Sequence, residues 1–142
     1  MQNLANNIKI SWVKALIASN ASTDSNTAIL DMSGFDGVVF VTPVTTATAG
    51  SVVTLTVEAN TANSDSGMAA ITGAVATKTS PANGTLLVVD VYRPQKRYVQ
   101  GVITSATQVA TFDATIAIQY SGSKMPLAEA ATIADQTIVV GS

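Results

Sequence analysis

The side chains that carry most enzyme chemistry are scarce in this sequence. It has no His and no Cys, and its 142 residues include 7 Lys or Arg and 9 Asp or Glu. General acid–base and nucleophilic catalysis need such groups held close together, and soft metals bind through His and Cys. The composition therefore predicts a protein that is not an enzyme and that uses no cofactor.

Two carboxylates flank a glycine corner and are the best candidates for a metal or acid–base site. Asp31 and Asp36 lie on either side of Ser33-Gly34-Phe35. Neighbouring carboxylates can bind Ca²⁺ or act as general acid and base. At a turn, however, they more often accept backbone hydrogen bonds, and we expect that role here. The polar loop from Asn60 to Gly67 lacks the regular acidic spacing of a calcium loop, so no metal site is predicted.

One basic cluster interleaves cations with tyrosines. Arg93, Lys96 and Arg97 lie between two tyrosines, the second of which is Tyr98. Such a cluster can stack on and pair with nucleic acid, but three cations are too few to indicate it. An Arg fork at a strand–turn–strand corner is better suited to bind a carboxylate, either Asp90 or an acidic group of a neighbouring subunit.

Trp12 is the single tryptophan and lies in an apolar stretch near the N-terminus. A Trp in a strand is more often an anchor in the core or in a subunit contact than a platform for a ligand. We therefore predict no catalytic, cofactor-binding or metal-binding residues, and an interface that includes Trp12, Arg93, Lys96, Arg97 and Tyr98.

Charge and hydropathy limit the partners. The net charge of −2 and the pI near 4.7 provide no basic footprint for nucleic acid. The apolar stretch Ile8–Ala18 contains two lysines and is too short to span a bilayer, so no membrane partner is expected. A content of 47% hydrophobic and 11% charged residues predicts that another protein covers part of the surface. The alternative is a surface solvated by the abundant Thr, Ser and Asn.

β-branched runs separated by turn residues predict an all-β fold, a β-sandwich or jelly roll of seven to eight antiparallel strands. In the first run, residues 8–14, alternation predicts that Lys9 and Ser11 face away from the core. The continuous apolar run Val38–Val41 predicts a central strand buried on both faces, and Pro43 is expected to limit pairing beyond it. In residues 51–58 the valines and Leu55 are expected to face inward.

Later segments extend the same pattern. Strands are predicted over residues 85–92, 97–104 and 111–120, while Met68–Ala76 fits either a short helix or a weak strand. The chain changes character after Met125-Pro126. We therefore predict a β-sandwich domain over residues 1–126 and a C-terminal arm over residues 127–142, with an Ala-rich part and a terminal strand near Gln136–Val140.

Two segments give the sequence a family resemblance. Asp31–Val38, DMSGFDGV, and Asp90–Val99, DVYRPQKRYV, occur in a short β-rich chain without His or Cys. In this combination the sequence resembles the capsid decoration, or cement, proteins of tailed bacteriophages, over roughly residues 5 to 126. The Ala-rich arm lies outside the resemblance.

The resemblance implies a structural role in the virion. It implies a jelly roll or β-sandwich that forms trimers, is made in the cytoplasm of the bacterial host, and binds the outer surface of the phage head. Its partner there would be the major capsid protein, whose lattice it would stabilise. Three weak contacts made together by one trimer would hold it firmly.

Two further classes remain open. Jelly rolls also serve as carbohydrate-binding or host-binding modules, although one Trp and three Tyr are few for sugar stacking. A tail-tube or connector subunit would be equally β-rich, and would form a ring rather than a trimer.

Overall fold

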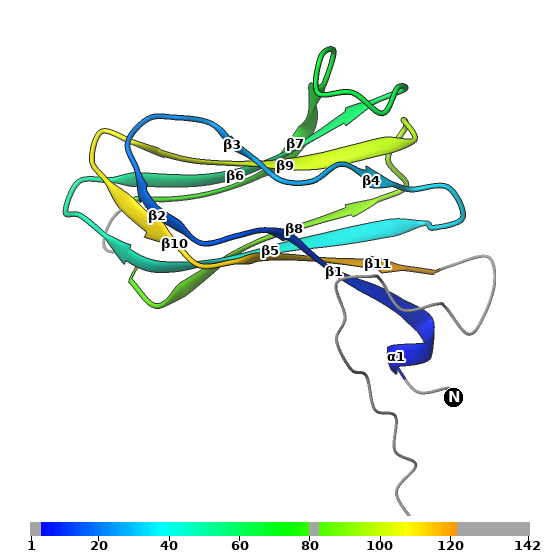
Figure 1. Ribbon diagram of the computed structural model, residues 1–142, viewed down its shortest axis with the longest axis horizontal. Coiled ribbons are helices and arrows are strands. Elements are labelled where there is room, and N and C mark those ends of the chain that lie inside the picture. Colours follow the sequence, from blue (N-terminus) through cyan, green and yellow to red (C-terminus); the bar gives the residue numbers. More distant parts are fainter. Residues whose placement is uncertain (1–3, 80–82, 122–142) are drawn as a thin grey trace, which may run out of the picture.

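Two antiparallel sheets pack face to face and enclose one apolar core. The computed structural model describes residues 4–79 and 83–121. One short helix, α1 (Leu4–Asn7), precedes the strands. Sheet A contains β1 (Ile8–Lys14), β2 (Ile17–Asn20), β5 (Gly37–Ala47), β8 (Thr85–Tyr92), β10 (Ala110–Phe112) and β11 (Thr115–Tyr120). Sheet B contains β3 (Ser25–Asn26), β4 (Leu30–Asp31), β6 (Val52–Asn60), β7 (Ala69–Thr79) and β9 (Tyr98–Ala106), and forms the upper layer in Figure 1.

The described strands occupy eight positions, four in each sheet. Three of these positions are each shared by two consecutive strands: β1 with β2, β3 with β4, and β10 with β11. Numbered along the chain, the positions run 1-8-3-6 in sheet A and 2-7-4-5 in sheet B. Strands that are neighbours in sequence thus often lie in opposite sheets, which is the topology of a jelly roll. The predicted fold class is confirmed.

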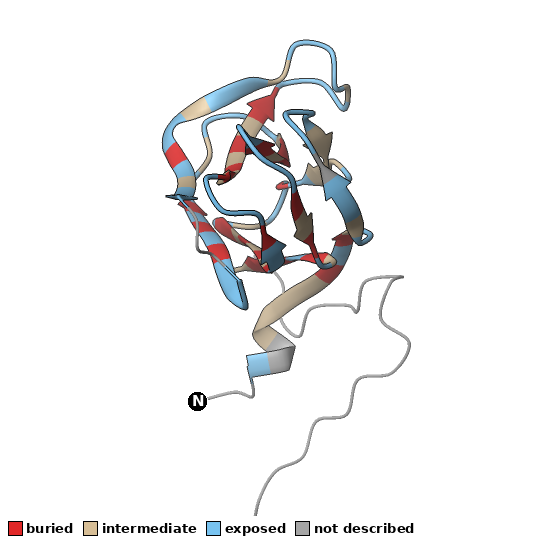
Figure 2. Cartoon of the chain, turned by 90° about the vertical axis from the view of Figure 1, so that its left-hand side faces the viewer, coloured by how far each residue is buried: buried red, intermediate tan, exposed pale blue. Residues whose placement is uncertain are grey.

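The core lies between the sheets and is built by alternation. In β6, Val53, Leu55 and Val57 are fully buried, as predicted. Phe40 of β5 and Phe112 of β10 are also fully buried. Figure 2 shows buried residues alternating with exposed ones along the strands. This period of two is what places one side of each sheet against the other.

The prediction for the first strand was wrong about which face is buried. Ser11 and Val13 are buried in β1, whereas Trp12 is 57% exposed. Ser11 pairs with Ala117, which pairs with Phe40 of the core, so this row faces inward. The sequence does alternate in this strand, but the side that carries Ile8, Ile10 and Trp12 faces away from the core.

Two predictions for the centre of the chain are resolved. β5 is a central strand, as predicted, with Val38 and Phe40 fully buried. Its outward side is less covered, because Val39 and Val41 are only partly buried. Pro43 does not end the pairing, since β5 runs to Ala47. The carbonyl oxygen of Pro43 accepts a hydrogen bond of 2.9 Å from the Asp113 amide, at the break between β10 and β11, where the ladder is already interrupted.

The undecided segment Met68–Ala76 belongs to a strand. β7 covers Ala69–Thr79 and pairs with β6, with a register shift between Thr56 and Glu58. The predicted C-terminal arm, residues 127–142, and the boundary at residue 126 lie outside the described residues.

Candidate interaction surfaces

The two segments that carry the family resemblance meet at one corner of the sandwich. We call the loops 32–36 and 93–97 the corner. The Met32 amide donates to the Arg97 carbonyl at 2.8 Å, and the Arg93 amide donates to the Asp36 carbonyl at 2.6 Å. Next to them, Asp31 of β4 pairs with Tyr98 of β9. A pocket opens between the two loops.

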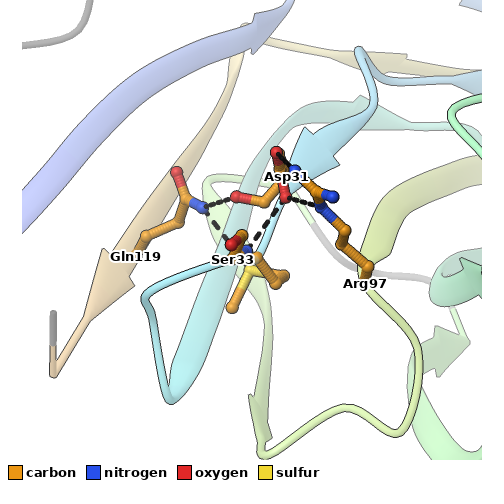
Figure 3. Close-up of polar contacts among 5 residues, drawn as sticks. Asp31, Ser33, Arg97 and Gln119 are labelled. Carbon is orange, nitrogen blue, oxygen red and sulfur yellow. Dashed lines mark hydrogen bonds and ion pairs between the residues drawn. The ribbon is translucent and has the colours of Figure 1, made fainter. Parts of the chain in front are cut away.

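An ion pair fastens this corner. Arg97 donates from Nε to Asp31 Oδ1 at 2.8 Å and from Nη2 to Asp31 Oδ2 at 2.9 Å, and the Ser33 amide also donates to Oδ1 (Figure 3). Gln119 of β11 donates to the Asp31 carbonyl, so that the corner is tied to sheet A. The bidentate fork is the geometry in which Arg binds carboxylates best.

The pKa values of the two paired side chains, Asp31 and Arg97, shift in opposite directions. Hydrogen bonding to Arg97, and then to the Ser33 amide, lowers the pKa of Asp31. Asp31 in turn raises the pKa of Arg97. Both side chains are about half exposed, so solvent weakens the attraction between them. The pair positions two loops and has none of the burial that prepares a carboxylate for acid–base chemistry.

The structure assigns other partners than those expected for the arginines. An Arg fork to a carboxylate was expected at this corner, with Asp90 as one candidate partner; Arg97 forms such a fork, and its partner is Asp31. Asp90 instead accepts a hydrogen bond of 2.6 Å from the Tyr120 hydroxyl. Arg93 stacks on the ring of Tyr92, with its guanidinium carbon 5.1 Å from the ring centroid.

Two of the carboxylates considered as metal ligands, those of Asp31 and Asp65, accept hydrogen bonds within the fold. Asp31 accepts backbone and Arg hydrogen bonds, which confirms the structural role expected for it. In the loop after β6, Asp65 accepts hydrogen bonds from Gln100 and Asn26 at 2.6 and 2.7 Å. Among the residues that the structure describes, no three acidic side chains are grouped so that they could hold a metal ion.

The outer face of sheet A carries many apolar side chains among the described residues. Three pairing rows cross it from β1 to β8 by way of β11 and β5. Their members are mostly apolar: Ile8, Tyr120, Gly37 and Tyr92; Ile10, Ile118, Val39 and Asp90; and Trp12, Ile116, Val41 and Val88. Beyond the third row, Pro43 of β5 pairs with Leu86 of β8. We call these fourteen positions the apolar face; within this set, Asp90 is the one charged residue.

Several of these side chains are open to solvent. Trp12 is 57% exposed, Leu86 60% and Tyr92 59%, while Val88 and Ile116 are more than 40% exposed. The indole Nε1 of Trp12 donates to the Lys14 carbonyl of its own strand at 2.6 Å. The polar atom of the ring therefore forms a hydrogen bond within β1, while much of the apolar ring is exposed to solvent.

The predicted interface residues fall on two surfaces. Trp12 lies on the apolar face, whereas Lys96, Arg97 and Tyr98 lie at or beside the corner. Arg93 joins the two, because it belongs to the corner and stacks on Tyr92 of the apolar face.

Sequence reasoning missed most of the apolar face. The signal was present in the doubly apolar run Leu86–Val89 of β8, where residues of both alternating sets are hydrophobic. Leu87 and Val89 are buried in the core, so Leu86 and Val88 must point outward.

Within the described part of the chain, no helix is both long and apolar enough to cross a bilayer.

Comparisons with known proteins give a fold and no family. No protein-family model matches the chain, and no curated protein matches it. Among solved structures, the PBSX exported protein XepA superposes with a TM-score of 0.57 at 16% identity, over 99% of this chain and 46% of XepA. A Clostridium thermocellum xylanase 10B with CBM22-1 and GH10 modules, complexed with xylohexaose, gives 0.50 at 17% identity, over 89% of this chain and 27% of the xylanase.

A protein from Bacillus endospore appendages, described as disulfide-linked pili, has a TM-score of 0.48 at 16% identity, over 84% of this chain and 96% of its own. The present chain spans less than half of XepA and about a quarter of the xylanase. At these identities the likenesses to XepA and to the xylanase show a shared fold alone.

Proposed function

We propose that this protein is a non-catalytic structural component of a phage virion, a capsid decoration protein that binds the major capsid protein on the outer surface of the head. The observation that carries the proposal is the apolar face of sheet A. A second surface, the corner with its cations, supplies the contact to the shell.

The apolar face is large enough to be an assembly surface. Four strands spaced about 4.8 Å apart and about 20 Å of strand length give it roughly 380 Å² in projection. The largest apolar patch on a typical monomer covers about 300–600 Å² and is often functional, and the apolar face falls within that range. Trp12 lies exposed on the edge strand β1 of this patch, and Trp is enriched among the anchor residues of interfaces. We infer that copies of the chain associate through this face, as trimers.

The corner differs from the apolar face in chemistry. Arg93 and Lys96 are exposed, and neither forms an ion pair within the described residues. Arg97 is already bound to Asp31. Arg93 and Lys96 are thus the cations available to acidic groups of the capsid protein, and a trimer presents three such corners, whose weak contacts add through effective concentration.

Two further observations support this assignment. The segments that resemble decoration proteins, residues 31–38 and 90–99, are joined by hydrogen bonds at the corner. The protein shares its fold over nearly its whole length with an exported protein of PBSX. An extracellular or virion-associated location fits both, and a rigid sandwich without a metal cluster in its described part suits a passive role.

Binding to phage heads tests the proposal directly. Expanded heads that lack the decoration protein are mixed with the purified protein and sedimented, and the bound fraction is measured at increasing salt. We expect binding that the double substitution Arg93→Ala and Lys96→Ala weakens at least tenfold. Lys14→Ala is the matched control, because Lys14 lies at the other end of β1 from the row that contains Tyr92. Failure of the wild-type protein to bind would contradict the assignment.

A polysaccharide-binding module is the second candidate. The fold likeness to the xylanase with a CBM22-1 module favours it, as do the exposed rings of Trp12 and Tyr92. Xylohexaose is the probe, and calorimetry with wild type and Trp12→Ala is the measurement. Saturable binding that Trp12→Ala abolishes would favour this candidate over decoration.

A further inference from the structure

The backbone of Arg93 adopts a conformation that residues with a side chain disfavour. Its φ is 54°, in the left-handed region, where the β-carbon crowds the carbonyl oxygen that follows it. The hydrogen bond of 2.6 Å from the Arg93 amide to the Asp36 carbonyl holds this turn in place. Strained residues of this kind gather at functional sites, where the surrounding structure maintains them.

Arg93 is one of the residues that line the pocket at the corner. This pocket has a volume of about 380 Å³, and its lining includes the buried Met32 and the partly buried Phe35. The ring of Tyr92 supports the guanidinium of Arg93, whose central carbon lies 5.1 Å from the ring centroid. The pocket therefore combines apolar walls with a cation that is held in place by stacking.

Cations are concentrated at this pocket. Three of the seven Lys and Arg of the chain fall within one stretch of five residues. Arg97 is bound to Asp31, whereas Arg93 and Lys96 are exposed and form no ion pair within the described residues. Asp36 is the one acidic residue among those that line the pocket. A carboxylate is the ligand that two such cations attract, and the planar Arg fork can bind it through two parallel hydrogen bonds.

A second pocket adjoins the first, because Gln95 and Lys96 line both. Its volume is about 310 Å³, and ligand sites in proteins cover about 300–1,000 Å³. The rest of its lining consists of small or apolar side chains of β6 and β7, namely Ala59, Ala69, Ala70, Ile71 and Thr72. The second pocket is therefore suited to an apolar side chain.

A bulge in β7 supplies part of this second pocket. The register between β6 and β7 shifts here, so that residues 71–74 lie opposite the single residue Val57. Gly73, with a φ of 82°, provides the left-handed conformation within the bulge. Bulges are common beside functional sites, where they redirect side chains or end the pairing of strands.

We propose that the two pockets together bind one extended segment of the major capsid protein, in which a carboxylate lies close to a branched apolar side chain. Arg93 and Lys96 bind the carboxylate, and the second pocket takes the apolar side chain. Arg93 keeps its strained backbone because glycine, which would relieve the strain, has no guanidinium. This inference rests on the proposed function and specifies the chemistry of the partner.

Paired substitutions separate the strain at Arg93 from its role in binding. Arg93→Gly and Arg93→Ala both remove the guanidinium, but only glycine relieves the left-handed backbone. We expect Arg93→Gly to unfold about 2–5 °C above Arg93→Ala in a thermal melt. Ser22 is exposed and has a φ of 59°, so Ser22→Gly should likewise unfold above Ser22→Ala. Equal midpoints for the two Arg93 variants would overturn the proposal that the site stores strain.

Binding to expanded heads that lack the decoration protein measures the role of each pocket. Arg93→Gly, Arg93→Ala and Ala70→Gln should each raise the half-saturating protein concentration about fivefold. Ala70→Gln fills the second pocket without adding a charge. Ser22→Gly and Ala106→Gln are the matched controls and should bind like wild type, because Ala106 is exposed at the end of β9 away from the corner.

The outcomes distinguish this inference from the proposed function. Wild-type binding that the Arg93 variants and Ala70→Gln leave unchanged would overturn the inference alone. Failure of the wild-type protein to bind would overturn the proposed function and the inference with it. A native mass of Ala70→Gln that differs from that of wild type would also overturn the inference, because a second copy of the chain would then occupy the pocket.

Discussion

The phenol ring of Tyr120 occupies the space that a side chain on residue 37 would need. A Cβ built on Gly37 would come within 2.6 Å of Tyr120 Cε2 and closer still to Cζ and the hydroxyl oxygen. The two residues are direct partners in the pairing of β11 with β5. The ring lies across the Gly37 backbone, and its hydroxyl reaches Asp90 on β8. One tyrosine therefore links three adjacent strands at the edge of the apolar face.

The substitution Gly37→Ala should displace the Tyr120 ring. The added methyl group cannot coexist with the ring in its present place, and the ring is the more mobile of the two. We expect the hydrogen bond to Asp90 to be lost and the pKa of Tyr120 to fall back toward 10. Absorbance at 295 nm during alkaline titration measures this. Gly84 and Gly101 are unsuitable sites for a control substitution, because Gly84 has a positive φ and Gly101 is buried. We therefore choose Ala114→Gly, at a partly buried loop position, as the control variant.

Tyr120 should make stability depend on pH in the alkaline range. Burial, and then the hydrogen bond to Asp90, raise its pKa from 10.0 to about 12. The raised value means that folding favours the protonated phenol, so its stabilising effect is complete below pH 10 and disappears as the pH rises toward 12. Urea unfolding at pH 9 and at pH 11.5 measures the loss.

Tyr120→Phe isolates this effect from the titration of lysines and other tyrosines. The variant lacks the phenol, so its stability should fall less than that of wild type between the two pH values. A loss of the same size in both proteins would show that Tyr120 does not titrate abnormally.

The Asp31–Arg97 pair should contribute to stability on the acidic side. The lowered pKa of Asp31 means that folding favours the carboxylate, so the contribution is present above its ordinary pKa near 3.8 and is lost as the pH falls through the lower, folded value. Asp31→Asn should flatten this part of the stability profile. Arg97→Lys should destabilise as well, because Lys cannot form the fork. Thermal unfolding between pH 2.5 and 6 provides the measurement. Identical pH profiles of stability for wild type and Asp31→Asn would contradict the prediction.

Phe40 should be among the most costly core residues to truncate. It is fully buried in the central strand of sheet A. Phe40→Ala should cost about 3–5 kcal/mol of unfolding free energy, through lost burial and the cavity left behind. Val109→Ala, at an exposed position outside the apolar face, is the control and should cost far less. Equal losses in urea unfolding would contradict the prediction.

The sequence predicts most of the sandwich because inward and outward residues alternate along its strands. Residues 51–58 are a clear case, since Thr and Glu separate the buried valines and Leu55. The number of strands and the class of fold follow from the same signal. The first strand misleads because Ile8, Ile10 and Trp12 are outside, and only the pairing of Ser11 with Ala117 and Phe40 reveals it.

The partners of the charged residues could not be derived from sequence. Asp90 is seven positions from Arg97, whereas Asp31 is sixty-six positions away, yet Arg97 binds Asp31 because β4 pairs with β9. Long-range pairing of this kind depends on strand order, which no local pattern specifies. The apolar face escaped detection for the same reason, since its rows combine four strands that are distant in sequence.

The native mass of the purified protein, by light scattering coupled to size exclusion, tests the central claim that the apolar face holds copies together. The account predicts a trimer, about three times the chain mass of 14.5 kDa, for wild type and for Val109→Ser, whose exposed apolar side chain lies outside the apolar face. Trp12→Ser should dissociate at concentrations where wild type does not, because loss of an aromatic anchor of an interface costs at least about 2 kcal/mol. A wild-type mass of one chain, or a trimer indifferent to Trp12→Ser, would contradict the account.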